Sequence, residues 1–158
     1  MRDPHEPTIV DADHPSIDGA IDHFLTELSA ERRFLGPSGS ADPTSHRSLV
    51  DALTDAAGGF RSASIVDGRV IALARVDRHG DLRVAVTAHH RGQGVGIHLV
   101  RHVVERARAR GTSRLCLRSS RRSPASLALA TRMGCMVVDR GRGRLDLVLD
   151  FSPITRSA

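Results

Sequence analysis

The chain has 158 residues, of which 40% are apolar, so it fits one domain over residues 1–158 and is too apolar to be wholly disordered. Its formal net charge is +5, from 23 basic and 18 acidic side chains, and every basic residue is an arginine. The absence of lysine excludes a phosphate-binding loop of the GxxxxGK[ST] type, and the absence of tyrosine excludes a tyrosine general acid.

Cysteine content and hydropathy indicate the compartment. Cys116 and Cys135 are too few for a disulfide framework and lack the spacing of zinc ligands, so we expect reduced, buried thiols and no metal site. No segment approaches the roughly 18 apolar residues of a membrane-spanning helix, and residues 1–7 lack the apolar stretch of a signal peptide. We expect a soluble, cytoplasmic protein without a membrane partner.

The N-terminal third combines one short strand with two helices. Residues 8–10 are a strand candidate, and Pro15-Ser16 opens a helix. The apolar residues of this helix recur at helical spacing, as Ile17, Ile21, Phe24, Leu25 and Leu28. Residues 36–45 are rich in Gly, Ser and Pro and predict a loop, and residues 46–57 predict a second helix.

The middle of the chain predicts a three-strand meander. Strand-like segments cover residues 60–66, 70–76 and 82–86. Asp67-Gly68 joins the first two segments and suits a tight hairpin, because both turn positions need positive φ. His79-Gly80 forms the second turn.

The C-terminal part alternates between helix and strand. An amphipathic helix that ends at Gly111 has one apolar face, made of Leu99, Val100, Val103, Val104 and Ala107. A strand at 115–117, a helix at 123–133, and strands at 136–138 and 145–151 follow. This order predicts an α/β fold, with a central twisted mixed sheet of about six to seven strands and helices on both faces.

A glycine-rich turn, Arg91-Gly92-Gln93-Gly94-Val95-Gly96, lies between a predicted strand and a predicted helix. Glycines let backbone N–H groups approach a ligand, and the helix adds unpaired N–H groups and its positive dipole end, so the segment suits a pyrophosphate. A dinucleotide fingerprint would need glycine at Ile97 and an acid near Arg118. What remains is the pattern Arg/Gln-x-x-Gly-x-Gly/Ala, which Arg91, Gly94 and Gly96 match. The structural alternative is that the glycines form only a tight turn between strand and helix.

This turn, after a three-strand meander and before an amphipathic helix, resembles the acetyl-CoA loop of the GNAT acyltransferase superfamily. The order of elements from about Thr8 to Phe151 is similar throughout. The resemblance implies an acetyl-CoA-dependent N-acetyltransferase with the GNAT fold. It also implies a set of coenzyme contacts, which are Val84, Val86, Arg91, Gly92, Gln93, Gly94, Val95, Gly96 and Ser123.

Three shorter segments resemble one branch of that superfamily. Residues 25–34 look like the LSPES-R-RF stretch of bacterial protein lysine acetyltransferases, and residues 107–111 and 127–134 look like other parts of those enzymes. The resemblance implies a protein lysine as acceptor, with acyl-CoA synthetases among the targets. Two other acceptors stay open, a small amine and a protein N-terminus. A module that binds acyl-CoA without turnover is an alternative to an enzyme, and a homodimer is a possible assembly.

The resemblance assigns the general base to Asp81, at the start of the fourth strand. An amine acceptor with a pKa near 10.4 must lose a proton before it attacks the thioester, and a carboxylate accepts that proton, directly or through a water. The alternative is that Asp81 only completes the His79-Gly80 turn. Imidazole also titrates near neutrality, so His89-His90 is a second candidate for the base.

The chain departs from many relatives at the general acid. Their tyrosine corresponds to Ala130 here, so a water or one of three nearby side chains would protonate the leaving thiolate, namely Ser123, Ser126 or Cys116. The resemblance also implies that a backbone N–H near Val86 stabilises the oxyanion.

Arginines are dense between residues 101 and 122. A nucleic-acid surface is one interpretation, but only four aromatic residues, all phenylalanine, are available to stack on bases. A solvated basic surface is therefore favoured, with Arg121-Arg122 close enough to the last helix to meet ligand phosphates. Acceptor specificity is expected in the loops at 35–45 and 139–144.

Overall fold

The computed structural model describes residues 6–31, 43–54, 58–120 and 124–151. The elements in chain order are β1 (Thr8–Asp11), η1 (Pro15–Ile17), α1 (Asp18–Ala30), α2 (Pro43–Thr54), β2 (Phe60–Val66), β3 (Arg69–Val76), β4 (Leu82–Val86), η2 (Ala88–His90), α3 (Val95–Ala109), β5 (Arg114–Ser120), α4 (Pro124–Met133), β6 (Met136–Gly141) and β7 (Arg144–Asp150). The predicted order of helices and strands is confirmed.

Helix α2 begins earlier than the sequence predicts. Residues 43–45 belong to this helix and not to a loop, which corrects the expectation drawn from their Gly/Ser/Pro-rich surroundings. Pro43 occupies the first helical position, where the fixed φ and the missing N–H of proline are tolerated. The rest of that predicted loop, 36–42, and the predicted end of the helix, 55–57, lie outside the described residues.

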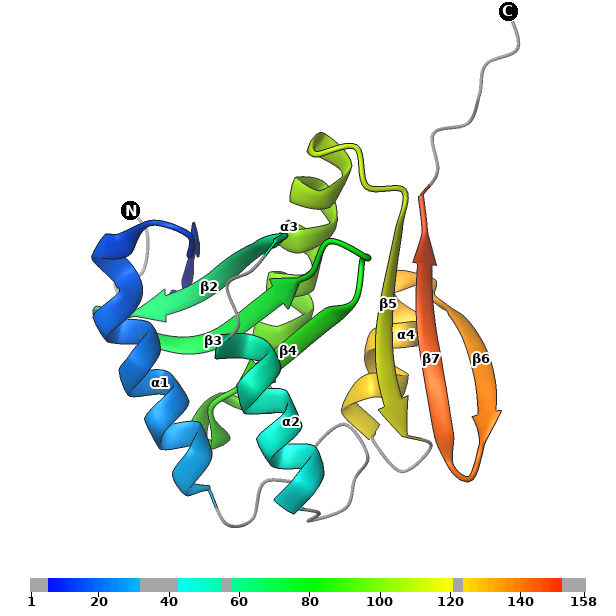
Figure 1. The fold of residues 1–158 in the computed structure, drawn as a ribbon, viewed down its shortest axis with the longest axis horizontal. Helices are drawn as coiled ribbons and strands as arrows, with labels where there is room; N and C mark the ends of the chain where they lie inside the picture. The colour runs from blue at the N-terminus through cyan, green and yellow to red at the C-terminus, as the bar shows by residue number, and fades with distance from the viewer. Residues whose placement is uncertain (1–5, 32–42, 55–57, 121–123, 152–158) are drawn as a thin grey trace, which may run out of the picture.

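The seven strands form two antiparallel sheets that adjoin at one point. The first sheet has the order β1-β2-β3-β4 and the second β5-β7-β6. Asp81 and Cys116 form a parallel bridge between the sheets, where the Cys116 N–H donates to the Gly80 carbonyl at 2.9 Å. Figure 1 shows β4 and β5 diverging from this point.

Helices cover both faces of the first sheet. Helix α3 packs on β2, β3 and β4, and helices α1 and α2 pack on the opposite face (Figure 1). The core on the α3 side contains Phe60, Ile71, Ala72, Ala74, Val76, Leu82, Val95, Leu99, Val100, Val103, Val104, Ala107, Leu115 and Leu129. The core on the α1–α2 side contains Ala12, Ile21, Phe24, Leu25, Leu28, Leu49, Leu53, Ala63, Val70, Leu73 and Ala85. The apolar faces predicted for α1 and α3 are thus both buried.

A bulge in β3 shapes the end of β4. Ser64 pairs with Ala72 and Ile65 with Val70, so Ile71 is an extra residue on β3. Its carbonyl accepts a hydrogen bond from the Thr87 N–H at 2.9 Å, just after the last residue of β4. The bulge therefore fixes the point at which the chain leaves the sheet and enters the glycine-rich turn.

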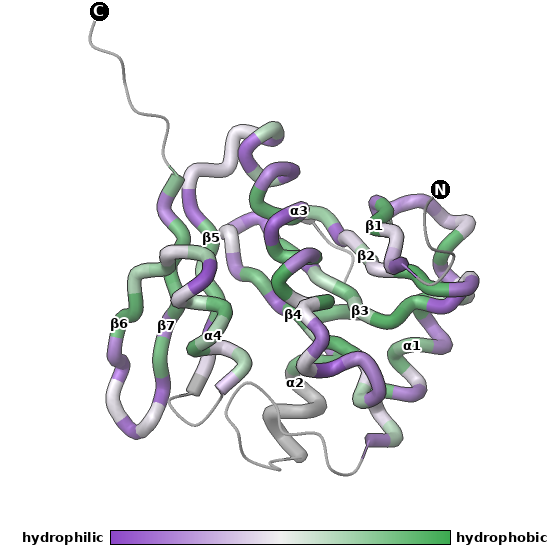
Figure 2. The backbone as a smooth tube through the Cα atoms, turned by 180° about the vertical axis from the view of Figure 1, so that it is seen from behind, coloured by the Kyte–Doolittle hydropathy of each residue, from purple (hydrophilic) through white to green (hydrophobic). Residues whose placement is uncertain are grey.

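Most of the described arginines between residues 101 and 120 are exposed, as the predicted solvated surface requires. Arg106 is half-buried, and the exposed ones are Arg101, Arg108, Arg110, Arg114 and Arg118. Figure 2 shows that β3 is largely hydrophobic, whereas the turn between β6 and β7 is hydrophilic. Two arginines of α3 stack on aromatic rings, with Arg106 4.5 Å from the Phe60 ring and Arg108 5.2 Å from the Phe151 ring.

Among the described residues, no helix is long and apolar enough to cross a membrane.

Candidate functional site

The glycine-rich segment forms a tight turn between β4 and α3. Gly92 and Gly94 have φ values of 75° and 81°, in the left-handed region where a Cβ costs roughly 1–2 kcal/mol. Gly94 is the N-cap of α3 and offers no side-chain cap, and the first turn of α3 carries no acidic residue. The N–H groups at this helix end, together with the helix dipole, therefore favour an anion.

A groove of about 370 Å³ opens beside this turn, within the usual range of small-molecule sites of roughly 300–1,000 Å³. It is lined by Val84, Ala85, Val86, His90, Arg91, Gly92, Gly94, Val95, Gly96, Ile97, Val100, Leu117, Ala125, Ser126, Ala128, Leu129 and Arg132. This described lining contains basic side chains but no acidic one, which suits an elongated ligand with an anionic end.

Most of the predicted coenzyme contacts meet in this groove. Those that line it are Val84, Val86, Arg91, Gly92, Gly94, Val95 and Gly96. Gln93 lies in the same turn but is not part of the lining, and its Nε2 donates to the His89 carbonyl at 3.1 Å. Ser123 lies outside the described residues.

Helix α4 supplies a wall that sequence reasoning missed. Ala125, Ala128, Leu129 and Arg132 line the groove and follow the i, i+3, i+4, i+7 spacing of one helical face. That spacing, with two small alanines that admit a ligand, is the sequence signal that was available. Leu117 of β5 is a further lining residue that was not predicted.

The two histidines before the turn have different positions. His90 lines the groove, and its Nδ1 lies 2.9 Å from the Thr87 Oγ1. His89 is exposed and does not line the groove. Ala130, at the position of the tyrosine of many relatives, is 5% exposed and lies outside the groove lining, one helical turn after Ser126.

Asp81 lies where β4 and β5 meet and not in the groove lining. Its backbone N–H donates to the Asp77 Oδ1 at 3.0 Å, and its carbonyl accepts from the Asp77 N–H at 3.1 Å, so it does take part in the turn. It is half-buried and bridges to Cys116 of β5. Asp81 thus stands where the two sheets meet, at the end of β4 that is remote from the glycine-rich turn.

Both cysteines are free, as predicted, but half-buried where buried thiols were expected. Strand β5 lies at the edge of the three-stranded sheet, so the Cys116 side chain is covered less completely than a side chain on a central strand. Burial raises the pKa of the Cys116 thiol, and the carboxylates of Asp146 and Asp81 raise it further. Burial also raises the pKa of the Cys135 thiol. Both groups therefore stay protonated at neutral pH.

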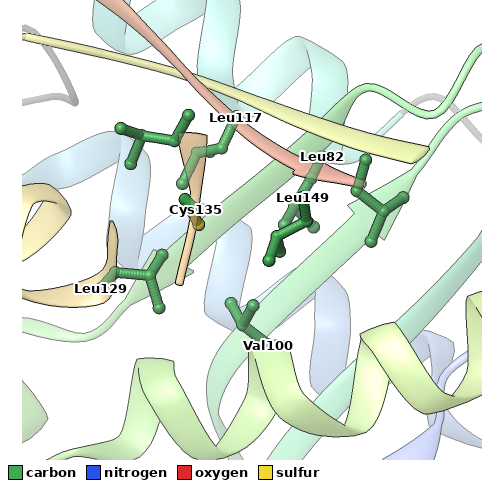
Figure 3. A pocket seen from close by; sticks show the side chains of 8 residues that line it. Leu82, Val100, Leu117, Leu129, Cys135 and Leu149 are labelled. Atoms are coloured by element: carbon green, nitrogen blue, oxygen red, sulfur yellow. The ribbon is translucent and has the colours of Figure 1, made fainter. Parts of the chain in front are cut away.

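A small apolar cavity of about 10 Å³ adjoins the groove (Figure 3). It is lined by Leu82, Val100, Leu115, Leu117, Leu129, Cys135, Leu147 and Leu149. Val100, Leu117 and Leu129 also line the groove and so separate the two spaces. A cavity of this size approaches the minimum for one water, roughly 10–15 Å³, but its apolar lining gives water no partner. It is packing space in the core.

The fold and the groove define an acyltransferase, and the comparisons with known proteins agree. The family model described as Acetyltransferase (GNAT) family matches residues 23–135, and the chain belongs to this family. It is accordingly an acyltransferase that uses acetyl-CoA as cosubstrate for N-acetylation. A search of curated proteins gave no significant match.

Solved structures of other GNAT proteins share the fold. The ribosomal-protein-S18-alanine N-acetyltransferase from Escherichia coli has a TM-score of 0.67 at 19% identity, with 97% of this chain and 99% of that chain covered. The GNAT domain of S. lividans PAT also has a TM-score of 0.67 at 19% identity, with coverages of 91% and 90%. The acetyltransferase yncA from Salmonella typhimurium, solved with acetyl-CoA, has a TM-score of 0.65 at 19% identity, with coverages of 94% and 96%.

Proposed function

We propose that the protein acetylates a primary amine, specifically a protein lysine side chain, with acetyl-CoA as the donor. The observation that carries the proposal is the single groove in which predicted coenzyme contacts from β4, the glycine-rich turn and α3 meet. The resemblance of residues 25–34 to protein lysine acetyltransferases supports the choice of acceptor.

The groove fits two parts of acetyl-CoA. The pyrophosphate of the coenzyme would accept hydrogen bonds from the N–H groups at the start of α3, and Arg132 adds positive charge to the same groove. Val84, Val86 and Leu117 give an apolar wall for the pantetheine arm. Ser123, just before α4, is proposed to hold that arm by a hydrogen bond.

Asp81 is the proposed general base. It accepts the proton of the acceptor ammonium through a water, since it stands outside the groove lining. The neutral amine then attacks the thioester carbonyl carbon, the C–N bond forms, the C–S bond breaks, and the coenzyme leaves as a thiolate that takes up a proton. A backbone N–H near Val86 is proposed to stabilise the oxyanion.

Ser126 is proposed to pass that proton from a solvent water to the thiolate. It lines the groove on α4, one turn before the buried Ala130. Cys116 is a weaker choice, because it does not line the groove. A leaving thiol with a pKa near 8.5 needs only modest assistance.

Transfer of a radiolabelled acetyl group tests the proposal. The acceptors compared are a lysine peptide with a blocked N-terminus, a peptide with a free N-terminus and no lysine, a small diamine, and an acyl-CoA synthetase. We expect labelling of lysine in the peptide or in the synthetase. Labelling of only the free N-terminus or the diamine would overturn the lysine assignment, and tight binding of acetyl-CoA without any transfer would favour a binding module.

A further inference from the structure

Glu31 connects the end of α1 with the segment that leads into the glycine-rich turn. It is the C-cap residue of α1, and its side chain is 20% exposed. Its Oε1 accepts a hydrogen bond from the Ala88 N–H at 3.3 Å, and its Oε2 pairs with the Arg91 Nη2 at 2.5 Å. One carboxylate thus holds both ends of η2, across nearly 60 residues of sequence.

Arg91 is held from a second side. Its Nε donates to the Val86 carbonyl, the last residue of β4, at 3.0 Å. The guanidinium therefore bridges the end of β4 and the end of α1, although the residue also lines the groove. A guanidinium in a pair with a carboxylate has much of its charge neutralised before any phosphate arrives.

We propose that Glu31 and Arg91 form a clamp that positions the glycine-rich turn, and that Arg91 supports coenzyme binding through Glu31 and not as a phosphate ligand. The inference rests on the proposed function, because the turn is the proposed pyrophosphate site. Its physical basis is preorganisation. Gly92 and Gly94 leave the turn many backbone conformations, and the clamp restricts them before the ligand binds, so less entropy is lost on binding.

The first experiment measures the Kd of coenzyme A by calorimetry for the wild type, Glu31→Ala, Arg91→Ala and the double variant. A clamp predicts that each single variant weakens binding by about fivefold. The double variant should also weaken it by about fivefold, because either substitution alone already breaks the Glu31–Arg91 pair. Glu27→Ala is the matched control, since Glu27 lies one turn earlier on α1 and pairs with Arg69 at 2.9 Å. It should bind like the wild type.

A direct phosphate contact predicts a different pattern. Glu31→Ala would then release Arg91 and tighten binding, and Arg91→Ala would weaken it by far more than Glu31→Ala. Arg91→Ala would also flatten the salt dependence of binding, because a screened charge–phosphate interaction would be gone. A clamp leaves the salt dependence of Arg91→Ala like that of the wild type. The proposal would be overturned by tighter binding in Glu31→Ala, by a much larger loss in Arg91→Ala than in Glu31→Ala, or by a flatter salt dependence in Arg91→Ala.

A second experiment keeps the clamp testable without any ligand. Amide hydrogen exchange of the free protein should be faster over residues 88–92 in Glu31→Ala than in the wild type or in Glu27→Ala. Unchanged exchange there would contradict the clamp whatever coenzyme A does. If exchange were faster in Glu31→Ala but the wild type did not bind coenzyme A, the clamp would stand and the proposed function would be refuted.

Discussion

Gly94 determines where α3 begins and how its N–H groups face the groove. Its φ of 81° is strained for any residue with a Cβ, although a Cβ would meet no atom within 4 Å. The effect of a substitution therefore comes from the backbone and not from a steric clash.

Gly94→Ala should weaken coenzyme A binding about tenfold, since a backbone cost of roughly 1–2 kcal/mol would move the turn out of its binding conformation. Gly111→Ala is the matched control, because Gly111 has the same φ of 81°, equally open space, and lies beyond the other end of α3. Isothermal titration should show normal binding for Gly111→Ala. Equal loss in both variants would contradict a specific role for the turn.

Asp81 has two roles that kinetics can separate. Asp81→Asn keeps the shape of the side chain and the backbone bonds to Asp77 but removes the base, so kcat should fall at least 100-fold, in the range of roughly 10²–10⁴ for general-base catalysis. The KM for acetyl-CoA should change little, because Asp81 does not line the groove. Asp77→Asn, in the same turn, is the control and should stay near wild-type kcat. If the two variants had equal kcat, Asp81 would be only a turn residue.

At the scale of elements, Arg106 fixes α3 against the first two strands. Its guanidinium pairs with Asp13 and Asp11 and donates to the carbonyl of Arg61, and it also stacks on the Phe60 ring. Because α3 presents its N-terminus to the groove, these contacts also orient the site.

Arg106→Met should lower the free energy of unfolding by about 2 kcal/mol, mainly through the lost hydrogen bond to the Arg61 carbonyl and the lost stacking on the Phe60 ring. The two aspartates are 43% and 64% exposed, so their ion pairs contribute little of this loss. The expected drop in Tm is about 4–8 °C for a domain of this size. Arg101→Met, at an exposed position of the same helix, should leave Tm within about 1 °C. An equal Tm for both variants would show that Arg106 does not anchor α3.

Local patterns in the sequence were sufficient for the elements and for one side of the groove. The turn from Arg91 to Gly96 was recognisable because its residues are contiguous and glycine has few other uses there. The α4 wall was not recognisable, because its position depends on how far β4 and β5 diverge. The pair of Glu31 and Arg91 also escaped prediction, since periodicity carries no signal between residues so far apart.

At the scale of the whole molecule, we expect the groove lined by β4, the glycine-rich turn, α3, β5 and α4 to bind acetyl-CoA. A ligand at 100 times its Kd adds about 2.7 kcal/mol to the free energy of unfolding. At roughly 2–4 °C per kcal/mol, that corresponds to a Tm increase of about 5–11 °C. The increase is large enough for a thermal-shift assay to resolve.

The most direct measurement is therefore a thermal-shift titration with acetyl-CoA and free coenzyme A, with NAD and ATP as controls. We predict that acetyl-CoA and coenzyme A raise Tm by several degrees, that NAD and ATP do not, and that Gly94→Ala needs a higher ligand concentration for the same shift. The absence of any shift with acetyl-CoA and coenzyme A would contradict this prediction, and the glycine-rich turn would then be only a connection between β4 and α3.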